Sequence, residues 1–381
     1  MKNINGLLIL RQWQDNKLYT SGTLFDTIYN SIKHNRSSVK EILFFNAEEW
    51  EFNWSDIKTD PSQPRFAEDA DLNSIREMEK LLIDRDIQLH IVYGSRGQIV
   101  PKPIPVENTT THYWPMFWLY GSLLYHRDNE SNILNPRLGT NIVPNKIGTC
   151  MINRAHNHRM ELMDTFAKDS LLDNALHYTW HNDRDTTEGE YKFKHWEDNN
   201  KVYSFPGDKF KGSVNQYSTS PPEEIWKGAI HIISESQPDG IFWTEKTFNA
   251  INWAVPFVIA GGRHINKMLT TYGFELYDEL FDYTFDAYSP YSRRINGISA
   301  QLKNLNDKYL YSDNFNNFNE IKKLTEEKVI RNRKNYQRIL KEHKFIPEIL
   351  KRLVKQYGKH DNDWDMLDLK FGTIDNAIIK E

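Results

Sequence analysis

The stretch AIHIISESQPDGIFWTEKTFNAINWAVPFVIAGG (residues 229–262) holds two apolar runs with a charged helix start between them. Residues 229–236 and 256–262 are short, continuous apolar runs of the kind that form buried strands. Thr244 has the chemistry of a helix N-cap, so we expect a helix to begin there. Strand, helix and strand in this order predict two parallel strands joined by a covering helix.

The same alternation extends through most of the chain. Short apolar runs predict further strands at 7–11, 41–46, 87–94, 148–153 and 175–180. Apolar residues at helical spacing predict helices at 22–35, 71–85 and 158–173. Two successive series of this kind predict two parallel sheets with covering helices.

The length of the chain favours more than one domain. It has 381 residues, and single cores rarely grow past about 250 to 300 residues. Loop-like stretches at 95–115 and 126–147 favour a boundary near residue 145. We therefore expect an N-terminal domain at 1–145, a second domain at 146–315 and a helical tail at 316–381. This outline fits the GT-B architecture of two facing Rossmann-like domains, although binding proteins and dehydrogenases share it.

Composition gives little indication of a partner. The net charge is −4 and the pI is about 6.4, which argues against a nucleic-acid coat protein or a membrane-surface protein. A single cysteine, Cys150, excludes an internal disulfide and fits a reducing compartment. The apolar run before Arg11 is too short for a signal peptide, and no run is long enough to span a membrane. We expect a cytoplasmic protein.

The predicted helix start at Thr244 places Glu245 and Lys246 in the first turn. Free N–H groups and the positive end of the helix dipole favour an anion at this position. A lysine there opposes the dipole unless a stronger anion binds nearby. This predicts a diphosphate at Lys246, with Glu245 accepting hydrogen bonds from hydroxyl groups such as those of a ribose. The alternative is an ordinary helix start with both charges in solvent.

A second cluster lies in MINRAHNHRMELM (residues 151–163), where a strand leads into a helix. Asn157 is the expected N-cap, and Arg159 then falls in the first turn. Ligands bind at the carboxyl ends of strands in open α/β sheets, and arginine can hold phosphate oxygens with two hydrogen bonds. The alternative is that Arg159 pairs with Glu161 or Asp164.

The two clusters, together with ISES, PFVIAGG and YGFELYDELFDYTFD, resemble the donor-binding half of GT-B glycosyltransferases related to the α-1,3-fucosyltransferases, including uncharacterised viral and phage members. The resemblance covers roughly residues 148–300. It implies that Arg159 and Lys246 contact the diphosphate of a nucleotide sugar and that Glu245 binds donor hydroxyls. It also implies that residues 146–315 form the nucleotide-sugar-binding domain, that residues 1–145 form the acceptor-side domain, and that Ser234, Glu235 and Ser236 face the donor cleft beside the helix start at Thr244. Gly261 and Gly262 would permit close approach of the backbone to the donor, although a tight turn explains them equally well.

The general base of such an enzyme is expected at a strand end of the N-terminal domain. The segment NAEEW (residues 46–50) follows a predicted strand and offers Glu48 and Glu49. Both can equally be solvated loop carboxylates. His112 and Asp56 are weaker candidates.

These features predict an inverting glycosyltransferase that needs no metal and no cofactor beyond its nucleotide-sugar co-substrate, with a glycan or another hydroxyl compound as acceptor. One alternative is a metal-dependent GT-A-type transferase that uses Asp183 and Asp185. Another is a non-catalytic sugar-binding or scaffold protein. Residues 321–359 hold thirteen Lys or Arg against four Glu. The resulting basic tail suggests a polyanionic acceptor such as a nucleic acid, or a simple solvated helix face.

Overall fold

The computed structural model describes residues 2–11, 39–46, 72–94, 107–116, 142–152, 156–180, 226–310, 317–361 and 363–367, with shorter pieces at 13–14, 17–18, 29–30, 32, 96–97, 119 and 193–195. The chain divides into two compact units. The first comprises Met1–Phe117 and Phe345–Lys370, and the second comprises Trp118–Lys344 and Phe371–Glu381. The domain boundaries expected at 145 and 315 stay predictions.

The first unit contains a sheet with the strand order β1-β2-β5-β6-β8. Its strands are β1 (Lys2–Ile4), β2 (Leu7–Arg11), β5 (Glu41–Asn46), β6 (Gln88–Tyr93) and β8 (Thr109–Tyr113). The last four are parallel, as predicted for β2, β5 and β6, whereas β1 is antiparallel to β2. Short strands β3 (Trp13–Gln14), β4 (Lys17–Leu18) and β7 (Arg96–Gly97) complete the unit.

Two parts of this sheet differ from the sequence-based expectation. The hairpin between β1 and β2 was not predicted, although Asn5 and Gly6 both have the positive φ that a two-residue turn requires. The prediction of a loop throughout 95–115 was wrong at β8, because the β-branched side chains of TTTHY suit a strand. Of the helix expected at 22–35, only residues 29, 30 and 32 are described, and they are helical.

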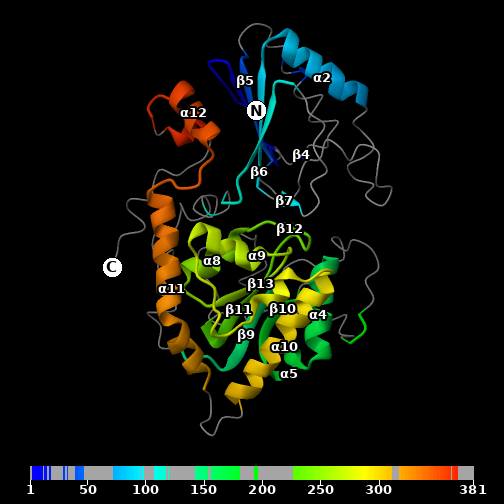
Figure 1. The fold of residues 1–381 in the computed structure, drawn as a ribbon, viewed down its shortest axis with the longest axis vertical. Helices are drawn as coiled ribbons and strands as arrows, with labels where there is room; N and C mark the ends of the chain where they lie inside the picture. Colours follow the sequence, from blue (N-terminus) through cyan, green and yellow to red (C-terminus); the bar gives the residue numbers. More distant parts are fainter. Residues whose placement is uncertain are drawn as a thin grey trace. The chain divides into compact units, whose positions relative to one another are not determined.

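Each face of this sheet is covered by one described helix. Leu8, Phe44 and Ile91 share a face and pack with Met78 and Leu82 of α2 (Leu72–Asp84). The opposite face meets α12 (Glu348–Tyr357), whose Arg352 and Tyr357 bond to Glu41 of β5. Figure 1 shows α2 and α12 on opposite sides of β5 and β6. The C-terminal chain therefore returns to complete the first unit.

The second unit contains a four-stranded parallel sheet with the order β10-β9-β11-β13. Its strands are β10 (Leu176–Trp180), β9 (Lys146–Ile152), β11 (Gly228–Ser234) and β13 (Phe257–Ala260), and a short strand β12 (Gly240–Ile241) lies outside it. Every residue of the central strand β11 and of the edge strand β13 is buried, as expected for strands covered on both faces of the sheet. The parallel βαβ unit expected at 229–262 is thus confirmed.

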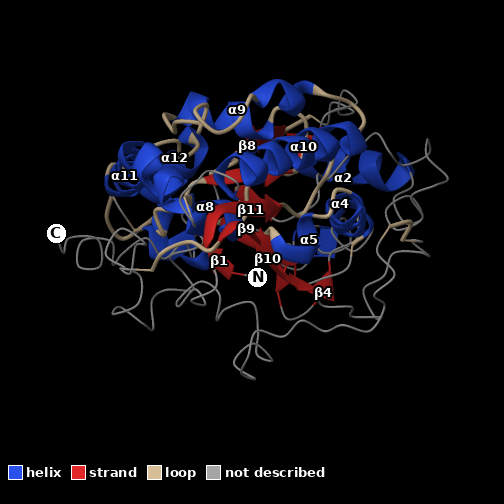
Figure 2. Ribbon diagram, turned by 90° about the horizontal axis from the view of Figure 1, so that it is seen from below, coloured by secondary structure: helices blue, strands red, loops and turns tan. Residues whose placement is uncertain are grey.

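Helices cover both faces of this second sheet. On one side lie α4 (Asn157–Lys168), α5 (Leu171–Asn174) and α10 (Tyr291–Leu310); on the other lie α8 (Glu245–Asn252) and α11 (Phe318–Lys341) (Figures 1 and 2). Four shorter helices complete the described structure, namely α9 (Ile265–Met268), η4 (Leu269–Tyr272), η5 (Tyr283–Ala287) and η6 (Trp364–Leu367). The protein is therefore an α/β protein with two Rossmann-like parallel sheets and C-terminal helices.

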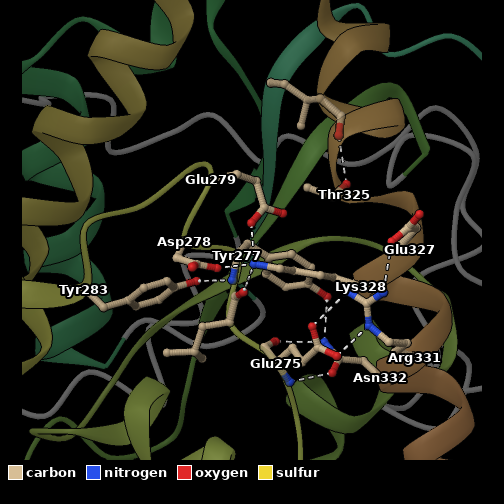
Figure 3. Close-up of polar contacts among 12 residues, drawn as sticks. Glu275, Tyr277, Asp278, Glu279, Tyr283, Thr325, Glu327, Lys328, Arg331 and Asn332 are labelled. Carbon is tan, nitrogen blue, oxygen red and sulfur yellow. Dashed lines mark hydrogen bonds and ion pairs between the residues drawn. The ribbon is translucent and has the colours of Figure 1, made fainter.

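The basic helix α11 is held to the second unit by charged contacts with residues 275–279 (Figure 3). Lys328 Nζ donates to Leu276 O at 2.8 Å and to Glu279 Oε2 at 2.5 Å, and it also pairs with Asp278. Arg331 donates to both carboxylate oxygens of Glu275, at 2.6 and 3.0 Å. Part of the positive charge of the predicted basic tail is therefore balanced by acidic residues from outside it.

Among the residues that the structure describes, no helix combines the length and the apolar character needed to cross a lipid bilayer.

Candidate functional site

The start of helix α8 has the geometry that the sequence predicts. Thr244 is the N-cap, with extended backbone angles, and its Oγ1 accepts a hydrogen bond from the backbone N–H of Lys246 at 3.3 Å. Glu245 and Lys246 occupy the first turn. The cap satisfies one of the amide groups that a helix start leaves without an intrahelical partner.

Glu235 follows β11 and is fully buried, with 0% of its surface exposed. Its Oε1 accepts hydrogen bonds from the backbone N–H of Thr244 at 3.0 Å and from Thr247 Oγ1 at 2.5 Å. Its Oε2 accepts a hydrogen bond from Thr244 Oγ1 at 2.6 Å. The carboxylate thus binds the first turn of α8 to the end of the central strand.

The ammonium group of Lys246 lies beside the same N-cap. Its Nζ donates to Thr244 Oγ1 at 3.0 Å, to Glu245 Oε1 at 3.1 Å and to Ser236 Oγ at 3.5 Å. Burial raises the pKa of Glu245, but the charge and hydrogen bond of Lys246 and the charge of Arg159 outweigh it and hold the pKa below its usual value. Glu245 is therefore ionised at neutral pH and acts as an internal counter-ion for Lys246.

Helix α4 begins at Asn157, and its N-cap is His156, which makes no side-chain cap bond. The prediction of Asn157 as the N-cap was wrong by one position, because the backbone already turns helical at that residue. Arg159 still falls in the first turn, as predicted, and only 5% of its surface is exposed.

His158 connects the start of α4 with the strand that precedes α8. Its Nε2 donates to the backbone carbonyl of Glu235 at 2.9 Å. Burial is the main cause that lowers the pKa of His158 to about 3, and the charges of Arg159 and Lys246 contribute. The ring is thus neutral at physiological pH, carries its proton on Nε2 and keeps a lone pair on Nδ1.

The two clusters predicted from the sequence therefore meet at one place. The charge of Arg159 acts on both Glu245 and His158, and the charge of Lys246 also acts on His158. Because β9 and β11 are neighbouring parallel strands, the helix starts that follow them lie at the same edge of the sheet. The alternative partner Asp164 accepts backbone hydrogen bonds from Lys194 at 3.1 Å and His195 at 2.7 Å.

Two hydroxyl groups in this half of the protein are buried without a hydrogen bond. Ser234 Oγ, at the end of β11, and Tyr291 Oη, at the start of α10, find no partner within the described ranges. The ring of Tyr291 meets that of His158 edge-on at 6.0 Å between centroids.

Of the two glycines predicted at the site, Gly262 fits tightly against the protein's own backbone. A Cβ atom on Gly262 would lie 1.9 Å from the carbonyl oxygen of Gly240. A Cβ atom on Gly261 would lie 2.9 Å from the side chain of Ile265, and the Gly261 carbonyl accepts a hydrogen bond from Arg294 Nε at 3.0 Å. Close approach to the backbone of Gly240 accounts for glycine at position 262, whereas the contact at position 261 is with the end of the Ile265 side chain, which can move.

Several predicted site residues fall outside the described part of the chain. These are the proposed bases Glu48 and Glu49, the weaker candidate Asp56, and the pair Asp183 and Asp185 of the metal-dependent alternative. Among the residues that are described, no group of three or more His, Cys, Asp or Glu side chains could hold a metal ion.

The weaker candidate His112 belongs to a polar network in the first unit whose centre, Glu41 and His90, is buried. Thr110 Oγ1 lies 3.1 Å from His112 Nε2 and 2.7 Å from His90 Nδ1. His90 Nε2 donates to Glu41 Oε2 at 3.0 Å, and Arg352 and Tyr357 of α12 also donate to Glu41. Burial, with the charges of His90 and Arg352, lowers the pKa of His112 to about 4.

Sequence reasoning did not find this network. Its available signal was a glutamate at the start of β5 and a histidine in the middle of the mostly apolar strand β6.

No protein-family model matches the chain. No curated protein and no solved structure shows significant similarity to it.

Proposed function

We propose that the second unit binds the diphosphate of a nucleotide sugar and that the protein is an inverting glycosyltransferase of the GT-B type that needs no metal. One observation carries the proposal. The cationic residues Arg159 and Lys246 lie in the first turns of α4 and α8, two helices that follow the neighbouring parallel strands β9 and β11. The carboxyl edge of such a sheet is where α/β proteins bind ligands, and helix starts favour phosphate groups.

The charges at this edge of the sheet allow a bound diphosphate to replace Glu245 as the counter-ion of Lys246. In the structure Glu245 balances the charge of Lys246. A diphosphate carries more charge than one carboxylate, so it competes with Glu245 for the ammonium group. Glu245 is then free to accept hydrogen bonds from ligand hydroxyls, the role that the resemblance to fucosyltransferases implies for it.

The same cations serve the proposed reaction. The acceptor oxygen attacks the anomeric carbon of the sugar, the bond from that carbon to the diphosphate breaks, and the diphosphate departs with the bonding electrons. Lys246 and Arg159 stabilise the charge that develops on the diphosphate. A base takes the proton of the acceptor hydroxyl; Glu48 and Glu49 stay our candidates for it.

Other parts of the proposal rest on the resemblance to α-1,3-fucosyltransferases. They include two domains that face each other, a hexosyl donor such as a nucleotide-linked fucose, and a glycan acceptor. A nucleic-acid acceptor is the weaker choice, because Asp278, Glu279, Glu275 and Glu41 pair with basic residues of the C-terminal helices.

A second candidate function is a non-catalytic sugar-binding module. The pairing of Lys246 with Glu245, 3.1 Å apart, favours it, since a site whose charges already balance also suits a neutral ligand. The two functions differ in their ligands. An enzyme of the proposed type binds a nucleoside diphosphate, whereas a sugar-binding module responds only to the free sugar.

Thermal-shift measurements with GDP-, UDP-, CMP- and dTDP-sugars, the matching nucleotides and the free sugars separate these candidates. We expect stabilisation by one nucleotide sugar and its nucleoside diphosphate in the presence of EDTA. Stabilisation only after Mn²⁺ is added would support the metal-dependent alternative. Stabilisation by a free sugar alone would support the binding module.

A further inference from the structure

The carboxylate of Glu235 is bound on both oxygens by groups of the protein itself. Thr244 donates twice and Thr247 once, at distances of 2.5 to 3.0 Å. All three residues are almost completely buried. These bonds use Glu235 to hold the first turn of α8 in place.

The backbone of the same residue holds the other helix. The carbonyl oxygen of Glu235 accepts the Nε2 proton of His158, which precedes Arg159 in the first turn of α4. One residue at the end of β11 therefore contacts the starts of both α4 and α8. Since Lys246 and Arg159 belong to these two turns, their separation depends on this junction.

A short chain of hydrogen bonds also connects Glu235 with the ammonium group of Lys246. Thr244 Oγ1 donates to Glu235 Oε2 and accepts from Lys246 Nζ at 3.0 Å. A hydroxyl group has one proton and two lone pairs. With its proton fixed on Glu235, Thr244 presents its lone pairs to Lys246, and this orients the ammonium group.

We propose that Glu235 is a positioning residue, which fixes the starts of α4 and α8 so that Lys246 and Arg159 address one ligand. The identity of the ligand rests on the proposed function, whereas the hydrogen bonds that define the positioning role do not. It differs from direct contact with the donor, because the Glu235 carboxylate is occupied by the protein and has no exposed surface.

Three variants and one control test the role. Glu235→Gln keeps an oxygen for the N–H of Thr244 and removes the negative charge, whereas Glu235→Ala removes the acceptors. Thr247→Val removes one of the three donors and is a milder change if Glu235→Ala does not fold. Asp286→Asn is the matched control, since Asp286 is another buried carboxylate of the second unit that accepts hydrogen bonds from Asn266 and Lys267 at the start of α9.

Two measurements are made on each purified variant. Calorimetric titration with GDP and UDP gives the affinity, and hydrogen–deuterium exchange reports the amide protons of the first turn of α8 without any ligand. In Glu235→Ala we expect faster exchange at Thr244 and an affinity about 10- to 100-fold lower, by analogy with the loss of residues that orient the ligands of a metal ion. Thr247→Val should change both in the same direction by less. Glu235→Gln should also lower the affinity, because its amide nitrogen cannot accept the Thr244 Oγ1 proton, and the lone pairs of Thr244 are then no longer fixed toward Lys246. Asp286→Asn should bind like the native protein.

The two measurements also separate failure of this role from failure of the proposed function. If the native protein binds neither nucleotide, the proposed function fails, and the exchange data alone still decide the positioning role. If Glu235→Ala exchanges and binds like the native protein, the positioning role is refuted. An equal loss of affinity in Glu235→Gln and Glu235→Ala, with native exchange in both, would instead indicate that the charge of Glu235 acts on the ligand directly.

Discussion

Replacing Lys246 with methionine removes the ammonium group of the proposed diphosphate site and keeps an unbranched side chain. The fold should survive, because the side chain of Lys246 is 30% exposed and its ion pair with Glu245 is of the partly solvated kind that contributes at most about 1 kcal/mol. The effect on ligand binding should be larger. A hydrogen bond to a charged group contributes about 1.5–3 kcal/mol, and 1.4 kcal/mol corresponds to a tenfold change in affinity.

We therefore expect Lys246→Met to bind nucleoside diphosphate about 10- to 100-fold more weakly, as measured by calorimetric titration. Lys267→Met is the control, since Lys267 is an exposed lysine of α9 in the same unit. It should bind like the native protein. If Lys246→Met keeps both the native affinity and the native melting temperature, the reasoning is refuted, because the nucleoside diphosphate then does not bind to this ammonium group.

Three further predictions concern the fold and the chemistry. Arg352→Ala should destabilise the protein at neutral pH by about 1–2 kcal/mol, less than a fully buried pair, because the guanidinium is 46% exposed. Burial raises the pKa of Glu41, but hydrogen bonds from Arg352, His90 and Tyr357 outweigh it and depress the pKa. The stabilisation that Arg352 gives through Glu41 is therefore present above about pH 4.3 and disappears as the pH falls through the folded-state pKa. Denaturant titrations at pH 7 and pH 3 check both statements. Gly262→Ala should destabilise the protein by about 2 kcal/mol or more in the same assay, because its Cβ overlaps the carbonyl of Gly240. Sugar transfer should survive EDTA, and complete loss that Mn²⁺ restores would contradict the metal-independent mechanism.

Local patterns predicted the centre of the second unit well. The apolar runs of β11 and β13 are continuous because both faces of the sheet are covered, and this leaves a strong signal in the sequence. Thr244 was recognisable as an N-cap because the cap bond spans only two residues. The sequence pattern was weaker for β1 and β8, where a two-residue turn and a threonine run were the only signals of a strand.

Contacts between distant residues could not be predicted in this way. Glu41 and Arg352 lie 311 positions apart, and nothing near either residue indicates the other. The sequence marked Glu235 as a polar residue at a strand end. That it turns back to bind Thr244 and Thr247 follows only from the packing of α8 on β11.

The most direct test of the account is a structure of the protein bound to the nucleoside diphosphate that stabilises it most. We predict phosphate oxygens within hydrogen-bond distance of Lys246 Nζ and of the Arg159 guanidinium, with Glu245 released from Lys246. A diphosphate bound elsewhere, with Lys246 Nζ still about 3.1 Å from Glu245 Oε1, would contradict the proposed site.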